Sequence, residues 1–123
     1  MEQFIETKKI NVAPYCALIL RLCAAELATR LGVLLPLPVV ATIIIFTLAD
    51  DQLTKIVHMG LPSGTIGKQR PSVPLMLSIA ATERLDRVRG KVAASVALTR
   101  VASWYYTMLR ENTKITLKLC LEE

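Results

Sequence analysis

The feature that most constrains the fold is a run of nineteen residues without a charge, LGVLLPLPVVATIIIFTLA, from Leu31 to Ala49. Arg30 precedes the run and Asp50 follows it. As a single helix it would be about 28 Å long, close to the thickness of the hydrocarbon core of a bilayer. The run is therefore either a membrane span or part of the core of a helical domain.

Two prolines, Pro36 and Pro38, interrupt this run. A proline inside a helix removes a backbone hydrogen bond, clashes with the preceding turn and costs about 3 kcal/mol. A proline in the first turn of a helix is well tolerated. We therefore expect one helix to end before Pro36 and another to begin at Pro38, with residues 39–49 buried at the centre of the fold. A proline-kinked membrane span over residues 31–49 is the alternative.

The spacing of apolar residues predicts helices along most of the chain. They are expected over residues 13–34, 38–59, 74–89 and 91–110, after a polar lead-in over 1–12 and with a Gly- and Pro-rich loop over 60–73. The helix over 13–34 carries an apolar stripe of Leu18, Leu22, Ala25 and Ala28. Residues 113–122 instead alternate apolar and polar side chains, which predicts an extended segment.

The charge of the chain is concentrated in its second half. The net charge is +5, and residues 60–123 carry ten basic and five acidic side chains, whereas residues 1–59 carry five of each. A basic excess favours a polyanionic partner, such as nucleic acid, an anionic membrane surface or an acidic protein face. The candidate contacts are Lys68, Arg70, Arg84, Arg87, Arg89 and Lys91. The alternative is that these residues form an ordinary solvated basic face.

Within this set, Arg84, Arg87 and Lys91 share one helix face if the helix continues through Gly90.

The cysteines and the single histidine do not form a metal motif. Cys16 and Cys23 are seven residues apart, roughly 10 Å along a helix, whereas each sulfur ligand lies about 2.3 Å from a zinc ion. With Cys120 the cysteine count is odd, which is typical of a reducing compartment. The N-terminus also lacks the pattern of a signal peptide. We therefore expect buried thiols, no metal site and an intracellular, soluble protein.

No pattern in the sequence indicates catalysis or a cofactor. Residues 60–68, GLPSGTIGK, lack the spacing of a phosphate-binding loop, because Pro62 stands where a glycine is needed and Gln69 where Ser or Thr would bind magnesium. His58 has no nucleophile or carboxylate beside it in the expected helix. The sequence thus predicts a protein that is not an enzyme and that has no cofactor.

Residues 20–46, LRLCAAELATRLGVLLPLPVVATIIIF, resemble the entry to a cyclin box. In that family a helix precedes a Leu-Pro turn, and the next helix opens with a Val-x-Ala-Thr-like run and carries a buried aromatic residue. The matching positions are Leu34–Pro38, Val39–Thr42 and Phe46. Residues 72–82 are similar to the buried third helix of the box and residues 105–119 to its closing helix and tail. The core repeat of the B-type general transcription factor shares this fold.

The resemblance implies an all-α fold, a compact cyclin-like bundle of five helices over residues 13–112 with a short extended segment over 113–123. It does not extend to the residues that hold a kinase. Cyclins carry a lysine in the third helix and a glutamate in the fifth, where Thr82 and Tyr105 stand nearest here. The end of the first box helix also differs, with Thr47–Ala49 in place of an Arg-Phe-Tyr-like triplet.

The sequence therefore predicts a non-enzymatic helical adaptor that binds a protein partner or nucleic acid within a larger assembly. One alternative is a small integral membrane subunit that spans the bilayer with residues 31–49. Another is a coat or filament-forming protein that self-associates through the alternating segment over residues 113–122.

Overall fold

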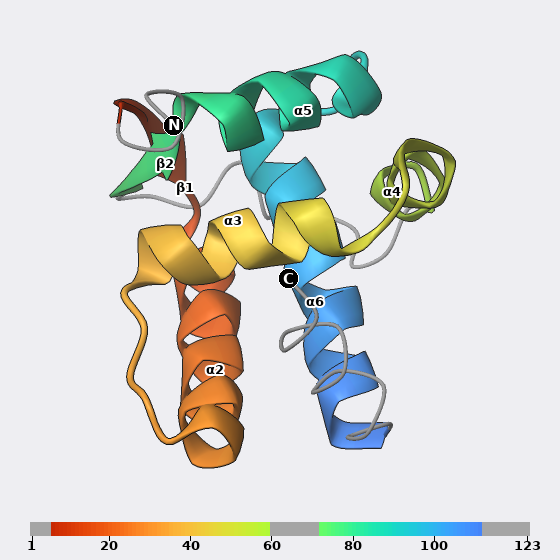
Figure 1. The fold of residues 1–123 in the computed structure, drawn as a ribbon. Coiled ribbons are helices and arrows are strands. Elements are labelled where there is room, and N and C mark those ends of the chain that lie inside the picture. The colour runs from red at the N-terminus through yellow and green to blue at the C-terminus, as the bar shows by residue number, and fades with distance from the viewer. Residues whose placement is uncertain (1–5, 60–71, 112–123) are drawn as a thin grey trace.

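The computed structural model describes residues 6–59 and 72–111, which form five helices and one two-stranded sheet (Figure 1). The elements are β1 (Thr7–Val12), α2 (Pro14–Leu31), α3 (Leu37–Thr47), α4 (Asp50–Val57), β2 (Val73–Ser78), α5 (Ile79–Arg89) and α6 (Ala94–Glu111). The prediction of a compact, mostly helical fold is confirmed. The alternating segment over 113–122 and residues 60–71 of the loop predicted over 60–73 lie outside the described residues, whereas Val73 begins β2.

The uncharged run divides at its prolines, as predicted. Gly32 ends α2 in the left-handed conformation, with a φ of 71°, and its N–H donates to the carbonyl of Ala28 at 2.9 Å. The chain then leaves the helix, and α3 begins at Leu37 with Pro38 in its first turn. Within residues 6–59 and 72–111, no single helix is long and apolar enough to cross a membrane. Only α3 and α4 together meet that criterion, and they are bent by 111°.

The prediction of a single helix over residues 38–59 is wrong, because this segment forms two helices, α3 and α4. The chain is extended at Leu48, with φ −105° and ψ 154°, between the end of α3 and the start of α4. Asp50 and Asp51 occupy the first turn of α4, where the helix dipole favours carboxylates. Both carboxylates are exposed, and they lie at the N-terminus of α4.

The small sheet is a second correction. β1 lies in the segment that was interpreted as a polar lead-in, and it pairs antiparallel with β2, so that Val12 stands opposite Val73. The third helix was expected to start near Pro74 but starts at Ile79, where the side chain of Ser78 accepts a hydrogen bond from the N–H of Ala81 at 3.3 Å. The burial of β2 alternates as strand geometry requires. The fourth helix likewise starts at Ala94 rather than Lys91.

The core is built around α6, which packs against α2, α3, α4, α5 and β1. Figure 1 shows α2 and α6 as two long helices with α3 crossing them. Tyr105 of α6, only 1% exposed, is the largest fully buried side chain among residues 6–59 and 72–111. α3 buries one face, formed by Val40, Ala41, Ile44 and Ile45, whereas Val39 and Ala49 are exposed. Central burial of the whole 39–49 segment is therefore not observed.

α2 turns a different face to the core from the stripe identified in the sequence. Its most buried residues are Cys16, Leu20, Cys23 and Leu27, which recur at helical spacing. Leu18 and Ala25, from the predicted stripe, are exposed. The helix is thus apolar on two sides, and only one side is covered by the rest of the molecule.

Candidate protein-binding surface

Arg84, from the predicted basic set, lies inside the junction of α3, α4 and α5. Its Nη1 donates to the carbonyl of Ile45 at 2.6 Å, its Nη2 donates to the carbonyl of Leu48, and its Nε donates to Asp50 Oδ1 at 2.9 Å. Its guanidinium carbon also lies 5.2 Å from the ring centre of Phe46. Because the side chain is only 11% exposed, Arg84 holds helices together rather than facing solvent.

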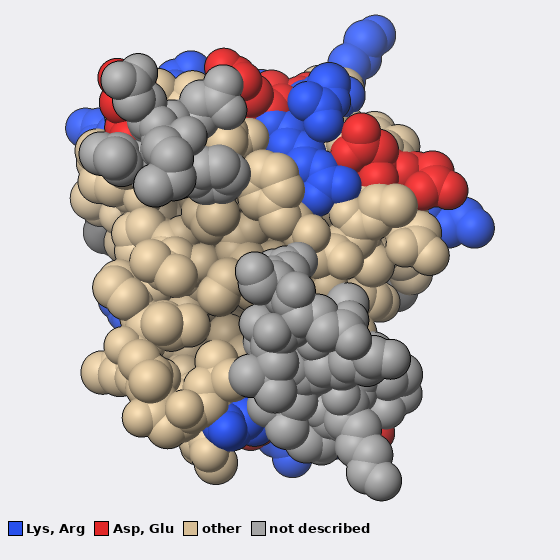
Figure 2. Space-filling view, viewed as in Figure 1, with Lys and Arg blue, Asp and Glu red and all other residues tan. Residues whose placement is uncertain are grey.

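Arg87 and Arg89 each have an acidic neighbour. Arg87 Nη2 lies 3.3 Å from Asp50 Oδ2, and Arg89 Nε lies 2.7 Å from Asp86 Oδ1. The pKa of Asp50 is held below its ordinary value, first by the hydrogen bond from Arg84 and then by the charges of Arg84 and Arg87. Figure 2 accordingly shows positive and negative side chains mixed together on the α4–α5 side of the molecule.

The remaining members of the basic set are not gathered with these arginines on one helix face. Gly90 ends α5 with a φ of 56°, so the helix does not continue to Lys91, which is exposed in the following turn. Lys68 and Arg70 lie outside the described residues. The structure thus brings Arg84 and Arg87 together around a carboxylate, and it leaves Lys91 apart from them.

Cys16, Cys23 and His58 contact other helices, and Cys120 lies outside the described residues. Cys16 and Cys23 are buried, and burial raises the pKa of their thiols to about 11 and about 12. Cys23 Sγ donates to the carbonyl of Ala102 at 3.6 Å, and His58 Nε2 donates to the carbonyl of Val88 at 3.0 Å. In the described part of the chain, no three His, Cys, Asp or Glu side chains lie close enough together to hold a metal ion.

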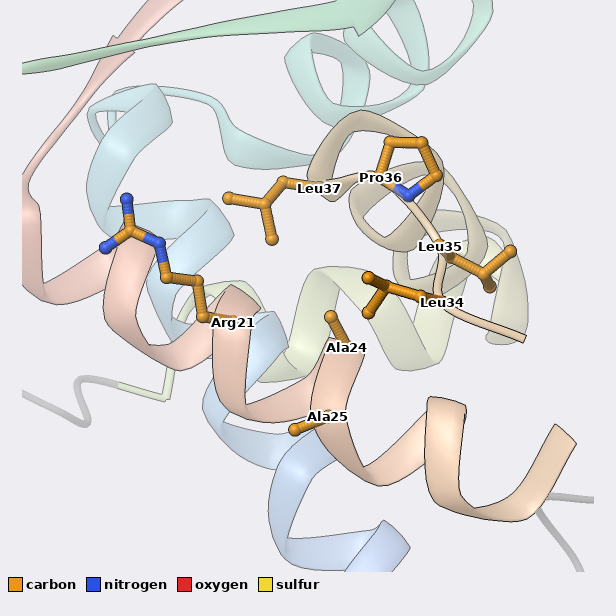
Figure 3. Close-up of a pocket in the computed structure, with 7 residues that line it drawn as sticks. All are labelled: Arg21, Ala24, Ala25, Leu34, Leu35, Pro36 and Leu37. Atoms are coloured by element: carbon orange, nitrogen blue, oxygen red, sulfur yellow. The ribbon is translucent and has the colours of Figure 1, made fainter. Parts of the chain in front are cut away.

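An open hollow of about 460 Å³ lies between α2 and the connection to α3 (Figure 3). Its lining residues are Arg21, Ala24, Ala25, Leu34, Leu35, Pro36 and Leu37. In Figure 3 the α2 residues form one wall and the connection forms the other, with the side chain of Leu34 directed towards Ala24. Every lining residue except Arg21 is apolar, so the hollow is a hydrophobic slot with one cation at its edge.

Several large apolar side chains of α2, α3 and the connection between them are exposed. Leu34 is 79% exposed, and Leu18, Val33 and Val39 are each at least two-fifths exposed. With Arg21 we name these residues the α2–α3 surface. Figure 2 shows a broad uncharged area over α2 and α3. Arg21 is exposed and makes no ion pair within residues 6–59 and 72–111.

The α2–α3 surface was not identified from the sequence. The run over residues 31–49 was interpreted as a buried seam, but its prolines hold residues 32–36 outside both helices and leave Val33 and Leu34 in solvent. The second apolar face of α2 was the feature of the sequence that could have indicated this surface. A helix that is apolar on two sides needs a covering surface on each side.

Thr82 and Tyr105, the positions nearest to the kinase-holding residues of cyclins, are both buried. Neither side chain is accessible to a partner in this structure. Comparisons of the chain with family models, with characterised proteins and with solved structures found no significant match.

Proposed function

We propose that this protein is a non-enzymatic adaptor that binds a partner protein through its α2–α3 surface. The observation that carries the proposal is Leu34, a large apolar side chain that is 79% exposed beside an open hydrophobic hollow. Covering one leucine side chain contributes roughly 1.5–3 kcal/mol. Contiguous exposed apolar side chains are typical of interaction sites, whereas single ones are common on any surface.

The chemistry of the surface favours an amphipathic helix that carries a carboxylate. The hollow is apolar along its length and has no acidic lining residue, so it accommodates apolar side chains of a partner. Arg21 at its edge is free of any ion pair with the described residues and is available to an Asp or Glu of that partner. Leu18 and Arg21 lie on one face of α2, which gives the partner helix a line of contacts.

A protein partner fits the charges of the molecule better than nucleic acid does. Three of the arginines proposed to contact a polyanion already pair with Asp50 or Asp86. A phosphate would have to displace these carboxylates, which reduces the electrostatic gain. The cyclin-box resemblance supports the same class of function, because it implies a helical box that binds a protein. A nucleic-acid partner and self-association through residues 113–122 stay predictions from the sequence.

A pull-down with matched variants tests the proposal. Wild-type protein and the variants Leu34→Asp and Met76→Asp are used as bait, and bound proteins are quantified by mass spectrometry. Met76 is also an exposed apolar side chain but lies on β2, outside the α2–α3 surface. We expect one partner to be retained by Met76→Asp and lost, by about tenfold or more, with Leu34→Asp. A partner retained equally by all three baits contradicts the proposal.

The charge prediction is tested on the purified pair. Arg21→Glu should weaken binding, and a compensating Asp or Glu to Lys change in the partner helix should restore it. Binding that is unaffected by Arg21→Glu means that no carboxylate of the partner meets this side chain.

A further inference from the structure

The two-stranded sheet has two outer edges, and its hydrogen-bond register determines which backbone groups face each of them. The N–H of Ile79 donates to the carbonyl of Glu6 at 3.1 Å, and these two residues are next in register after the last pair of the sheet. In an antiparallel ladder only every second residue of a strand bonds to the neighbouring strand. The even-numbered residues of β1 therefore face β2, whereas Thr7, Lys9 and Asn11 direct their N–H and C=O groups away from it.

The edge of β1 that faces away from β2 is accessible. The side chains of Thr7, Lys9 and Asn11 are all exposed, and among the residues that the structure describes none of their backbone groups has a hydrogen-bond partner. Leu75 and Leu77 of β2 are buried and α3 packs against this strand, so the covered side of the sheet is its inner face. A row of unpaired N–H and C=O groups is a template for a further strand.

The opposite edge, along β2, offers fewer free backbone groups. The outward positions there are Pro74, Met76 and Ser78. Pro74 has no N–H to donate, and the carbonyl of Ser78 already accepts a hydrogen bond from Thr82 Oγ1 at 3.0 Å. An added strand therefore finds more donors and acceptors along β1 than along β2.

The lysines of β1 determine what kind of strand fits its edge. Lys8 and Lys9 are exposed, project to opposite faces of the sheet and make no ion pair with a described residue. A second copy of β1, paired antiparallel about either lysine, would set two like charges directly opposite each other, which is destabilising. Aspartate or glutamate opposite these lysines would be stabilising for the same reason.

We propose that the edge of β1 binds an extended acidic segment of a partner protein, which adds a third strand to the sheet. The backbone of the segment bonds to Thr7, Lys9 and Asn11, as in other cases where a peptide joins an exposed sheet edge. Its carboxylates face Lys8 and Lys9 on the two sides of the sheet. This edge shares no residue with the α2–α3 surface, so it is independent of the function proposed above.

A titration of the isotope-labelled full-length protein, followed by nuclear magnetic resonance, tests this proposal. The probe is the capped peptide Thr-Val-Thr-Glu-Glu-Val-Thr, and the control peptide carries Lys in place of both Glu residues. The Glu peptide should bind saturably below about 1 mM, shift the amide resonances of β1 and slow hydrogen exchange at the N–H of Lys9. The Lys peptide should bind at least about tenfold more weakly. Absence of saturable binding by the Glu peptide, or equal binding of the two peptides, overturns the proposal.

Two variants at Asn11 separate backbone pairing from attraction by charge alone. Asn11→Pro removes one outward N–H and no hydrogen bond within the sheet, and proline is tolerated at such a position of an edge strand. It should weaken binding of the Glu peptide about tenfold. Asn11→Ala, the matched control, should stay within about twofold of wild type. Equal affinities of the two variants overturn the proposal, because the peptide would then be held without backbone pairing.

A third variant tests the charge with every backbone group kept. Lys9→Glu should weaken binding of the Glu peptide about tenfold or more, and it should improve binding of the Lys peptide. Unchanged preference for the Glu peptide contradicts the assignment of its carboxylates to this edge. A dimer of the wild-type protein that Asn11→Pro dissociates would assign the edge to a second copy of the chain and would also overturn the proposal.

Discussion

At the residue scale, Arg84 joins α5 to the end of α3 and the start of α4. The last carbonyls of a helix have no partner within the helix, and they need donors from elsewhere. Arg84 donates to the carbonyls of Ile45 and Leu48 across 39 and 36 residues of sequence. Its guanidinium also covers the ring of Phe46. The sharp turn from α3 to α4 therefore depends on a residue of α5.

Replacing Arg84 should destabilise the protein. We expect Arg84→Met to lower the free energy of unfolding by about 2–4 kcal/mol, because two carbonyl acceptors lose their donors. Urea unfolding followed by Trp104 fluorescence measures the change. Arg87→Met is the control, since Arg87 shares Asp50 but its side chain is 60% exposed. That variant should stay within about 0.5 kcal/mol of wild type, and equal losses in the two variants would contradict the internal role of Arg84.

The thiols of Cys16 and Cys23 should be unreactive in the folded protein. Their pKa values are raised to about 11 and about 12, chiefly by burial, so almost no thiolate is present at pH 8. We expect iodoacetamide at pH 8 to modify neither residue in native protein and both in urea, as measured by peptide mass spectrometry. Modification of either thiol at the same rate in both conditions would show that the helices do not shield it.

The same thiols should make stability depend on pH in the alkaline range. An unfolded thiol titrates near pH 9, whereas the folded thiols titrate only at about 11 and about 12. Because the raised pKa favours the protonated form in the folded state, this contribution is present below pH 9 and is lost as the pH rises from 9 to 12. The free energy of unfolding, measured from pH 8 to pH 10.5, should therefore fall less steeply with pH in Cys23→Ala than in wild type. Parallel curves would contradict this expectation.

At the element scale, Gly32 determines where α2 ends. Its φ of 71° is a conformation that L-residues disfavour, but a Cβ added there would meet no atom within 4 Å. We therefore expect Gly32→Ala to lower the free energy of unfolding by about 1 kcal/mol through backbone strain alone. Gly32→Asn should cost roughly half as much, since asparagine tolerates this region. Urea unfolding measures the loss of free energy of unfolding in each variant. Equal losses in the two variants would exclude backbone strain as the cause.

Elements whose ends are set by local chemistry could be predicted from the sequence. The division of the 31–49 run follows from the two prolines, because each forbids an interior helix position whatever surrounds it. The ion pair of Glu26 and Arg30, at 3.4 Å, likewise follows from their i,i+4 spacing on one helix. In both cases the determining residues lie within one or two helical turns of each other.

Features that depend on distant segments could not be predicted. The paired residues of β1 and β2 lie more than 60 positions apart in the sequence, so the hydrophobic pattern of one strand does not identify its partner. The burial of Arg84 likewise depends on carbonyls of α3 and α4 that no spacing within α5 reveals. The exposure of Leu34 follows from the path of the connection after α2, and that path also creates the hollow beside Arg21.

At the scale of the whole molecule, the N-terminal strand belongs to the same core as the helices. Val12 at the end of β1 is 1% exposed and falls in one hydrophobic cluster with Leu77 of β2 and Leu98 of α6. The N–H of Ala13 donates to Ser95 Oγ at 2.8 Å, which joins the start of α2 to the start of α6. A fragment that begins at residue 13 would therefore lack part of the common core.

This continuity predicts a single cooperative unfolding transition. Val12→Ala removes two methyl groups from the core and should lower the free energy of unfolding by about 2 kcal/mol. Trp104 lies on α6 and reports on the unfolding of that helix. The midpoint of the curve followed by Trp104 fluorescence should shift to a lower urea concentration, together with the midpoint followed by the far-UV circular dichroism of all the helices. Asn11→Ala, at the exposed neighbouring position, should leave both curves within about 0.5 kcal/mol of wild type. If β1 were an independent appendage, Val12→Ala would leave the Trp104 transition where it is in wild type.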